Sequence, residues 1–231
     1  MQDTQSDGSS ISDPQLSDAV IQLAPLENAY SESASAYEAQ TQTQNSDTDI
    51  DGNHDTMLPS QHIARMNWDV SAVNTAADAL SKAAIALENA VNAIADARKT
   101  AMTQWKGDAA EAADKDFGKI SSYCSDQLKQ IKAMDTAMTG DSGVVAALTS
   151  MSSQIDSEAA TLARENADNV QAIYDTGNDS PPPADGTVAA APAEVYQAIS
   201  TMKNFIWTQL DGLSGVTKAV QRYEQPTVTL S

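Results

Sequence analysis

Four long stretches of the chain carry apolar residues three and four positions apart, and this spacing limits the possible folds more than any other feature. The first stretch, residues 69–104, contains neither Gly nor Pro. An uninterrupted helical repeat of that length predicts one helix of about 35 residues, about 50 Å long. Residues 110–138, 148–173 and 195–223 repeat the pattern. The spacing therefore predicts four long amphipathic helices.

Short segments rich in Gly, Pro and Asp separate these stretches. The sequences WKGD (105–108) and TGDSG (139–143) can end helices, and residues 176–192 contain three consecutive prolines, which a helix interior does not accommodate. Aromatic residues make up only 5% of the chain, so a core of Ala, Val, Ile, Leu and Met would suit closely packed helices. We expect an all-α fold in which residues 61–140 and 141–223 form two long antiparallel hairpins of an up-down four-helix bundle, with a tail at 224–231.

Residues 1–60 differ from the rest in composition. They contain eleven acidic residues and no Lys or Arg, and they are rich in Ser, Thr and Gln. Such a segment buries too little apolar surface to offset its ordering entropy, which predicts a mostly disordered acidic leader. Residues 16–37 do show a helical repeat, but Pro25 interrupts it, so we expect only a short helix that depends on a partner.

The charge balance and the apolar runs argue against several classes of partner. The net charge of −19 would repel nucleic acid and anionic lipid, so we expect neither nucleic-acid binding nor electrostatic membrane docking. No apolar run reaches the roughly 18–20 residues that cross a bilayer. The N-terminal sequence has neither the basic start nor the apolar segment of a signal peptide, so we expect none to be cleaved.

The residues that enzymes use are scarce. The chain has one cysteine and two histidines, and no Glu-x-x-His pair, Gly-rich phosphate loop or Gly-x-Ser-x-Gly elbow. We expect no paired buried carboxylates, and we place His54 and His62 beside the leader and Cys124 on an apolar stripe as an inert thiol. The sequence thus indicates a non-enzymatic protein with no cofactor and no metal.

The turn between the first two stretches has specific chemistry. Gly107 can adopt the left-handed conformation that ends a helix, and Asp108 can cap the next helix, with Glu111 completing a capping box. We expect the chain to reverse here into an antiparallel hairpin. Two roles for Trp105 stay open: a plug that covers the end of the hairpin seam, or a recognition residue.

A helical hairpin with Trp105-Lys106-Gly107 at its turn resembles the Trp-x-Gly (early-secreted-antigen-like) family of type VII secretion substrates, over about residues 66–140. The resemblance implies a hairpin that pairs with a second hairpin, in a homodimer or heterodimer, to form a four-helix bundle. It also implies export by an ATPase-driven membrane machine, and hence a secreted or cell-surface location without a cleaved signal peptide. Trp105 and Gly107 would then form the export or recognition motif.

The family's export signal adds a Tyr-x-x-x-Asp/Glu element, and here the sequence departs from the pattern. No tyrosine of the chain has an acidic residue four positions later. We hypothesise that Tyr174, Asp175 and Asp179 replace the element and form one surface with Trp105. We also hypothesise that residues 142–223 act as a built-in partner for the first hairpin, which predicts a monomer, whereas a homodimer is the alternative.

The function that these features favour is that of an exported interaction or structural protein that acts through helix packing and displays the Trp-x-Gly turn. Two alternatives remain. The first is a helical effector that opens and inserts into membranes, and the second is an intracellular helical adaptor.

Overall fold

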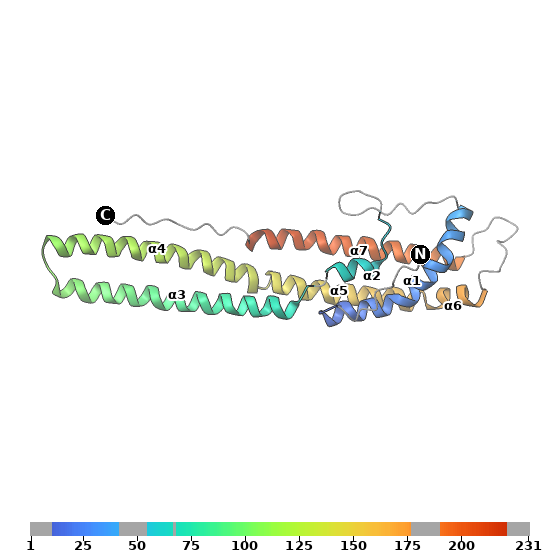
Figure 1. Ribbon diagram of the computed structural model, residues 1–231, viewed down its shortest axis with the longest axis horizontal. Coiled ribbons are helices and arrows are strands. Elements are labelled where there is room, and N and C mark those ends of the chain that lie inside the picture. Colours follow the sequence, from blue (N-terminus) through green and yellow to red (C-terminus); the bar gives the residue numbers. More distant parts are fainter. Residues whose placement is uncertain (1–10, 42–54, 67, 177–189, 221–231) are drawn as a thin grey trace. The chain divides into compact units, whose positions relative to one another are not determined.

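The computed structural model describes residues 11–41, 55–66, 68–176 and 190–220, and every regular element in these ranges is an α-helix (Figure 1). The all-α prediction is confirmed. The helices are α1 (Pro14–Thr41), α2 (Pro59–Met66), α3 (Val70–Gln104), α4 (Asp108–Thr139), α5 (Val144–Glu165), α6 (Ala167–Thr176) and α7 (Ala190–Val220).

The four predicted helices occur where the apolar repeats placed them. Residues 69–104 form α3 and residues 110–138 lie within α4, while residues 195–223 correspond to α7 as far as Val220. The third stretch forms both α5 and α6, which meet at Asn166. Helical hydrogen bonds continue across this junction, because the Asn166 N–H donates to the Leu162 carbonyl at 3.1 Å and the Asn166 carbonyl accepts from Val170 at 2.9 Å.

The helices belong to two compact units. One, here called the core unit, comprises Met1–Val70 and Leu148–Leu213; the other, here called the hairpin unit, comprises Ser71–Ala147 and Ser214–Ser231. This division differs from the predicted one, in which residues 1–60 stood apart from both hairpins. Each unit is considered by itself.

Helix α1 supplies much of the buried apolar surface of the core unit. Leu16, Leu23 and Leu26 are at most 1% exposed, so the prediction of a mostly disordered leader is wrong for residues 14–41. The other fully buried aliphatic side chains come from α2, α5 and α7 and include Ile63, Ile155, Val195, Ile199, Met202 and Ile206. The average composition of the segment concealed one apolar face that other helices of the same chain cover. Residues 1–10 and 42–54 lie outside the described residues.

The start of α1 is fixed by its own sequence. The Asp13 carboxylate accepts hydrogen bonds from the backbone N–H groups of Gln15 and Leu16 at 2.9 and 3.3 Å, which satisfies two donors that a helix start leaves free. Pro14 follows as the first helical residue, where its missing N–H costs nothing.

Pro25 does not end α1, contrary to the expectation of a short helix. The helix continues from Pro14 to Thr41, with Pro25 inside it. Proline removes the hydrogen bond to the carbonyl four residues earlier, which here belongs to Ile21. Both Pro25 and Ile21 are exposed, so water can bond to that carbonyl. Figure 1 shows that α1 bends along its length, as proline-containing helices commonly do.

The hairpin unit is built from α3 and α4, which lie side by side and run antiparallel (Figure 1). Three polar contacts join them along their length. Ser81 donates a hydrogen bond to Asp135, the Lys132 ammonium lies 2.6 Å from Glu88, and Arg98 pairs with Asp114 at 2.7 and 3.0 Å. These pairs fix which residues of the two helices face each other.

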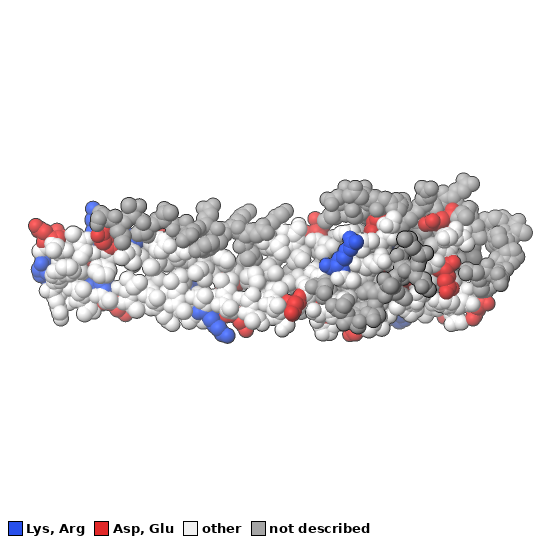
Figure 2. All heavy atoms as spheres, viewed as in Figure 1, with Lys and Arg blue, Asp and Glu red and all other residues white. Residues whose placement is uncertain are grey.

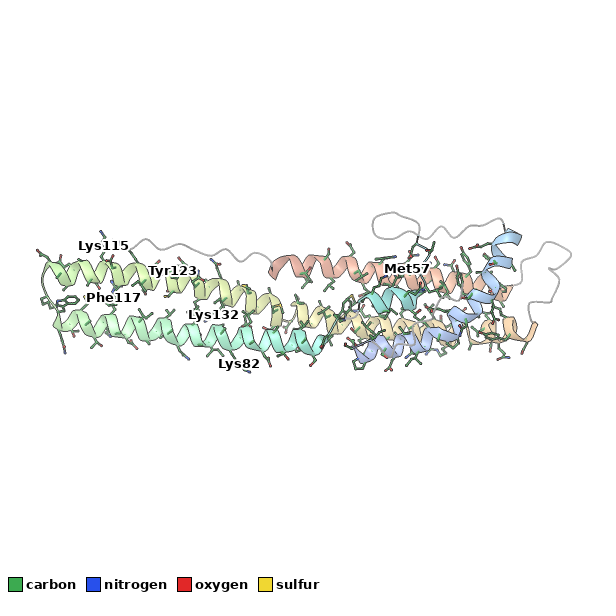
Figure 3. The ribbon with its side chains drawn as sticks, viewed as in Figure 1. Met57, Lys82, Lys115, Phe117, Tyr123 and Lys132 are labelled. Atoms are coloured by element: carbon green, nitrogen blue, oxygen red, sulfur yellow. The ribbon has the colours of Figure 1, made fainter. Side chains whose placement is uncertain are left out.

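The seam between α3 and α4 is only partly covered. Ala77 and Ala84 are buried, and the larger apolar side chains along the seam are only partly buried, among them Leu80, Leu87, Val91, Ile94, Phe117, Ile120, Leu128 and Ile131. Figure 2 shows that acidic and basic side chains are scattered over this unit among uncharged ones. Figure 3 shows Phe117 of α4 lying between the two helices near the turn. Two helices alone thus leave apolar surface in contact with water.

Replacing a buried residue of α1 tests whether this helix belongs to the folded core. We expect Leu23→Ala to lower the free energy of unfolding by about 2–5 kcal/mol, because Leu23 is 0% exposed and its loss leaves a cavity. Urea unfolding followed by tryptophan fluorescence measures the change. Ile21→Ala is the matched control in the same helix: Ile21 is 58% exposed, and its removal should change stability by no more than about 0.5 kcal/mol. Equal effects of the two substitutions would contradict the burial of α1.

Candidate functional site

The Trp-x-Gly turn connects the C-terminal end of α3 to the start of α4. The Trp105 N–H still donates to the Ala101 carbonyl at 3.0 Å, so the backbone stays helical up to this residue. The Lys106 ammonium donates to the Met102 carbonyl at 3.1 Å and places a positive charge at the negative end of α3. Gly107 then has φ +94° and ψ 177°, a conformation that residues with a Cβ rarely adopt. The φ of Gly107 is positive, as the predicted left-handed conformation requires, but its ψ is extended, so Gly107 does not adopt the left-handed helical conformation that the sequence predicted.

The predicted capping of α4 by Asp108 is wrong. Gly107 occupies the N-cap position, Asp108 is already the first helical residue, and among the described residues no side chain caps this helix. The Gly107 carbonyl accepts from the Ala110 and Glu111 N–H groups at 2.9 and 3.1 Å. The extended ψ of Gly107 starts the helix one residue earlier than the sequence suggested. Asp108 and Glu111 still lie in the first turn of α4, where the helix dipole stabilises negatively charged carboxylates.

Trp105 is 47% exposed, so about half of the residue is covered and half is open to contact. It lines a shallow depression of about 350 Å³ together with neighbouring side chains of α3 and α4, including Met102, Ala110 and Asp114. The plug and the recognition role of Trp105 both stay predictions. Lys106, Glu111 and Asp114 line the same depression, so charges of both signs lie near the ring, and Figure 2 shows acidic and basic side chains close together at one end of the hairpin unit.

The residues proposed to replace the missing export element lie in the other unit. Tyr174 of α6 is 42% exposed, and Asp175 beside it accepts a hydrogen bond from Gln171 at 2.7 Å. Partial burial and the Glu32 carboxylate raise the pKa of Tyr174, so its hydroxyl is neutral at physiological pH. Asp179 lies outside the described residues. Trp105 belongs to the hairpin unit and Tyr174 to the core unit, so neither unit contains both.

A buried polar cluster, not expected from the sequence, lies inside the core unit. Its centre is Asp55, which is 4% exposed. The Asp55 carboxylate lies 2.8 Å from His62 Nε2. It also accepts a hydrogen bond from the Met57 N–H at 3.0 Å and one from Trp207 Nε1 at 3.4 Å. The Lys203 ammonium donates to the Asp55 main-chain oxygen at 3.1 Å. One aspartate thus connects α2 with α7.

Glu27 forms a second buried contact, between α1 and α2. It is 1% exposed and accepts hydrogen bonds from the Ser60 N–H at 2.7 Å and from the Ser60 hydroxyl at 2.6 Å. Glu27 and Asp55 are two buried carboxylates, each with its own hydrogen-bond partners, and the Lys203 charge favours the ionised form of both. Partnered buried charges are retained, whereas removal of one partner leaves the other uncompensated.

Burial and neighbouring charges shift the pKa values in this cluster. Burial raises the pKa of Glu27, and the Ser60 hydrogen bonds and the Lys203 charge oppose this rise without cancelling it. Burial lowers the pKa of His62, despite the nearby Asp55 carboxylate. For Asp55, burial alone would raise the pKa. The Met57 hydrogen bond, His62 and Lys203 outweigh this effect, so the pKa of Asp55 lies below its usual value. The cluster therefore contains a neutral His62 that donates from Nε2 to an ionised Asp55.

Trp68 and Cys124 lie outside the cluster described above. Trp68 donates from Nε1 to the Ser152 hydroxyl at 3.3 Å, and Ser152 donates to the buried Asp13 carboxylate at 2.7 Å. Cys124 is half-buried in α4. Among the described residues, no group of three or more His, Cys, Asp or Glu side chains is placed to hold a metal ion. In the same part of the chain, no helix has the length and apolar character that would span a bilayer.

Comparisons with known proteins do not assign a family. The sequence matches no protein-family model, and neither the curated proteins nor the solved structures compared with it gave a match. The resemblance to Trp-x-Gly proteins therefore stays a prediction from the residues of the turn.

Two local signals could have revealed the folded α1 and the buried cluster. Asp13-Pro14 is an N-cap followed by a proline at the first helical position, a pattern that marks a true helix start. Lys203 follows Ile199 by four residues and precedes Ile206 by three, which places a charge on the apolar stripe of a predicted helix. A lysine at such a position requires a buried partner. The identity of that partner depends on the tertiary fold.

Gly107→Ala tests the geometry of the turn. The positive φ strains any residue with a Cβ, so we expect the substitution to lower the stability of the hairpin unit by about 1–3 kcal/mol. Urea unfolding monitored by far-UV circular dichroism measures this. Gly118→Ala in α4 is the control, because a Cβ there meets only the Arg98 side chain at ordinary contact distances. It should be neutral or stabilising by up to about 1 kcal/mol. A neutral Gly107→Ala would contradict the turn conformation.

The His62–Asp55 pair predicts a pH dependence. The folded-state pKa of His62 is lowered, so the unfolded chain binds more protons than the folded one once the pH falls below about 6.5. His62 therefore contributes stability above this pH and loses it on acidification. We expect thermal melts to show a loss of stability between pH 7.5 and 5.5 that is smaller in His62→Gln. The raised pKa of Glu27 makes its own contribution to stability grow on acidification, and this contribution is the same in the native protein and in His62→Gln.

The matched control for this pH series is His54→Gln, which alters the only other histidine of the chain. It should retain the slope of the native protein. If His62→Gln and His54→Gln both keep that slope, His62 is not the titrating group.

Proposed function

We propose that this chain is a non-enzymatic interaction protein that is exported by a type VII pathway and presents the Trp105 turn for recognition. The observation that carries the proposal is an exposed tryptophan at the end of a hairpin of two long helices. Trp105 is 47% exposed in a chain with only three tryptophans, and Gly107 beside it has a positive φ. Large aromatic side chains of this kind dominate the energy of many protein interfaces.

The contacts at the turn support a fixed presentation of the ring. The Trp105 backbone is held by Ala101, Lys106 folds back on the Met102 carbonyl, and the Gly107 carbonyl binds two N–H groups of α4. A side chain on a pre-ordered backbone loses less conformational freedom when a partner binds it. The depression of about 350 Å³ beside the ring offers a partner both apolar and charged neighbours. The proposed partner at this turn is the ATPase-driven export machinery.

The half-covered seam between α3 and α4 supports a helical partner for the hairpin unit. Its leucine, valine and isoleucine side chains remain half-exposed, and a second pair of helices packed along them would remove them from water. Within the proposal, this cover is either another segment of the chain, which gives a monomeric four-helix arrangement, or a second hairpin in a homodimer or heterodimer. The proposed location is secreted or at the cell surface, after synthesis in the cytoplasm.

The proposal includes Tyr174, Asp175 and Asp179 as a replacement for the Tyr-x-x-x-Asp/Glu element. The 42% exposure of Tyr174 is compatible with recognition. If the element acts together with the turn, Tyr174→Phe should leave the fold unchanged and reduce export. Normal export of Tyr174→Phe, with export of Trp105→Ala abolished, would restrict the signal to the turn.

An export assay in the source organism tests the proposal. We expect the native protein in the culture supernatant and Trp105→Ala retained in the cell pellet, because the substitution removes the exposed ring proposed as the recognition surface. Ile85→Ala is the control: Ile85 is 59% exposed in α3 of the same unit, so the variant loses a similar exposed apolar group away from the turn. It should be exported normally.

Circular dichroism of the purified proteins shows whether each variant is folded. Retention of a folded Trp105→Ala, with normal export of Ile85→Ala, supports recognition of the turn. Equal export of all three proteins would show that the turn is not a signal, and retention of the native protein would favour an intracellular adaptor.

A further inference from the structure

A pocket of about 660 Å³ lies in the core unit, beside the buried polar cluster. Its walls come from α2, from the residues on either side of α2, and from α7. The lining is mainly apolar and includes Met57, Met66, Trp68, Trp207 and Leu210. Figure 3 shows Met57 beside α7. Pockets of this size and character are typical of small-molecule sites, which use apolar walls and a few polar groups.

The polar ends of both tryptophans are already engaged. Trp207 Nε1 donates to Asp55 and Trp68 Nε1 donates to Ser152, so neither indole N–H needs a ligand. The edge of the His62 ring packs against Trp207, with ring centroids 4.8 Å apart. These contacts hold the rings in place, and what the walls offer a ligand is chiefly indole, thioether and aliphatic surface. The body of the ligand should therefore be apolar.

The two charged side chains that line the pocket differ in whether a ligand can reach them. Asp55 is 4% exposed, and its carboxylate accepts hydrogen bonds from His62, Trp207 and the Met57 N–H. Arg65 also lines the pocket but is exposed, and it forms no ion pair with any of the described residues. The accessible charge is thus a guanidinium, which binds carboxylates well.

We propose that this pocket binds a small amphiphile that has an apolar body and a single carboxylate, with the body against Trp68 and Trp207 and the carboxylate on Arg65. His62 supports the site from behind: with Nε2 directed at Asp55, its Nδ1 has no proton and adds no positive charge of its own. The site is independent of the Trp105 turn, which belongs to the hairpin unit.

Tryptophan fluorescence offers a direct binding assay. The chain has three tryptophans, so in a Trp105→Phe background only the two indoles of the pocket emit. The probe is decanoate, titrated below its aggregation concentration into the full-length protein. We expect a saturable change in emission, with decanol as the neutral comparison of equal chain length binding more weakly than decanoate.

Arg65→Gln tests the role of the guanidinium, and Arg164→Gln is its matched control. Arg164 is an exposed arginine of α5 in the same unit, it forms no ion pair with the described residues, and it does not line the pocket. We expect Arg65→Gln to weaken decanoate binding by up to about fivefold, the upper end for an ion pair open to solvent, and to leave decanol binding unchanged. Arg164→Gln should affect neither probe.

Three results would overturn the proposal. Emission that never saturates with decanoate would show that the pocket does not bind such a molecule. If Arg65→Gln and Arg164→Gln weakened decanoate binding equally, the effect would come from the net charge of the protein and not from a contact with Arg65. Tighter binding of decyltrimethylammonium than of decanoate, retained in Arg65→Gln, would show that the pocket selects cations. Circular dichroism during each titration confirms that the protein stays folded.

Discussion

The apolar face of α1 is the constraint on which the core unit depends. Leu16, Leu23 and Leu26 are almost completely buried, and they lie in one unit with the buried stripes of α5 and α7. None of these helices is apolar all round, so each would expose its stripe if α1 were absent. Burial of apolar side chains contributes about 1.5–3 kcal/mol each, which is large against the marginal stability of a small domain. The N-terminal segment is therefore a structural part of the protein.

Buried charges then restrict how α2 can pack against its neighbours. Asp55 binds His62, Trp207 and Lys203, while Glu27 binds Ser60. A shift of α2 along α1 or α7 would leave at least one of these buried groups without its partner, at a cost of several kcal/mol. Apolar contacts tolerate small shifts, so it is the polar cluster that selects one arrangement. The same cluster holds in place Trp207, one of the two tryptophans of the amphiphile pocket.

Local sequence patterns predicted the long helices well and the tertiary partners poorly. The spacing of apolar residues located α3, α4 and α7, and the positive φ of Gly107 followed from its place between two helices. The predicted cap at Asp108 was wrong because no sequence motif indicated the extended ψ of Gly107, which makes Gly107 the N-cap. The folded α1 was missed because a composition average over residues 1–60 hides one apolar face. The cluster around Lys203 joins residues about 150 positions apart, which no local pattern can reveal.

In the proposed function the hairpin unit presents Trp105, while the core unit contains the buried cluster and the pocket. This account requires α1 to be folded in the isolated chain, and native-state hydrogen exchange read by mass spectrometry tests that requirement most directly. We predict that peptides from α1 around Leu23 are protected to the same degree as peptides from α7 around Met202, because both helices open only when the core unit unfolds. Exchange of the α1 peptides at the rate of an unstructured chain, with the α7 peptides still protected, would contradict it.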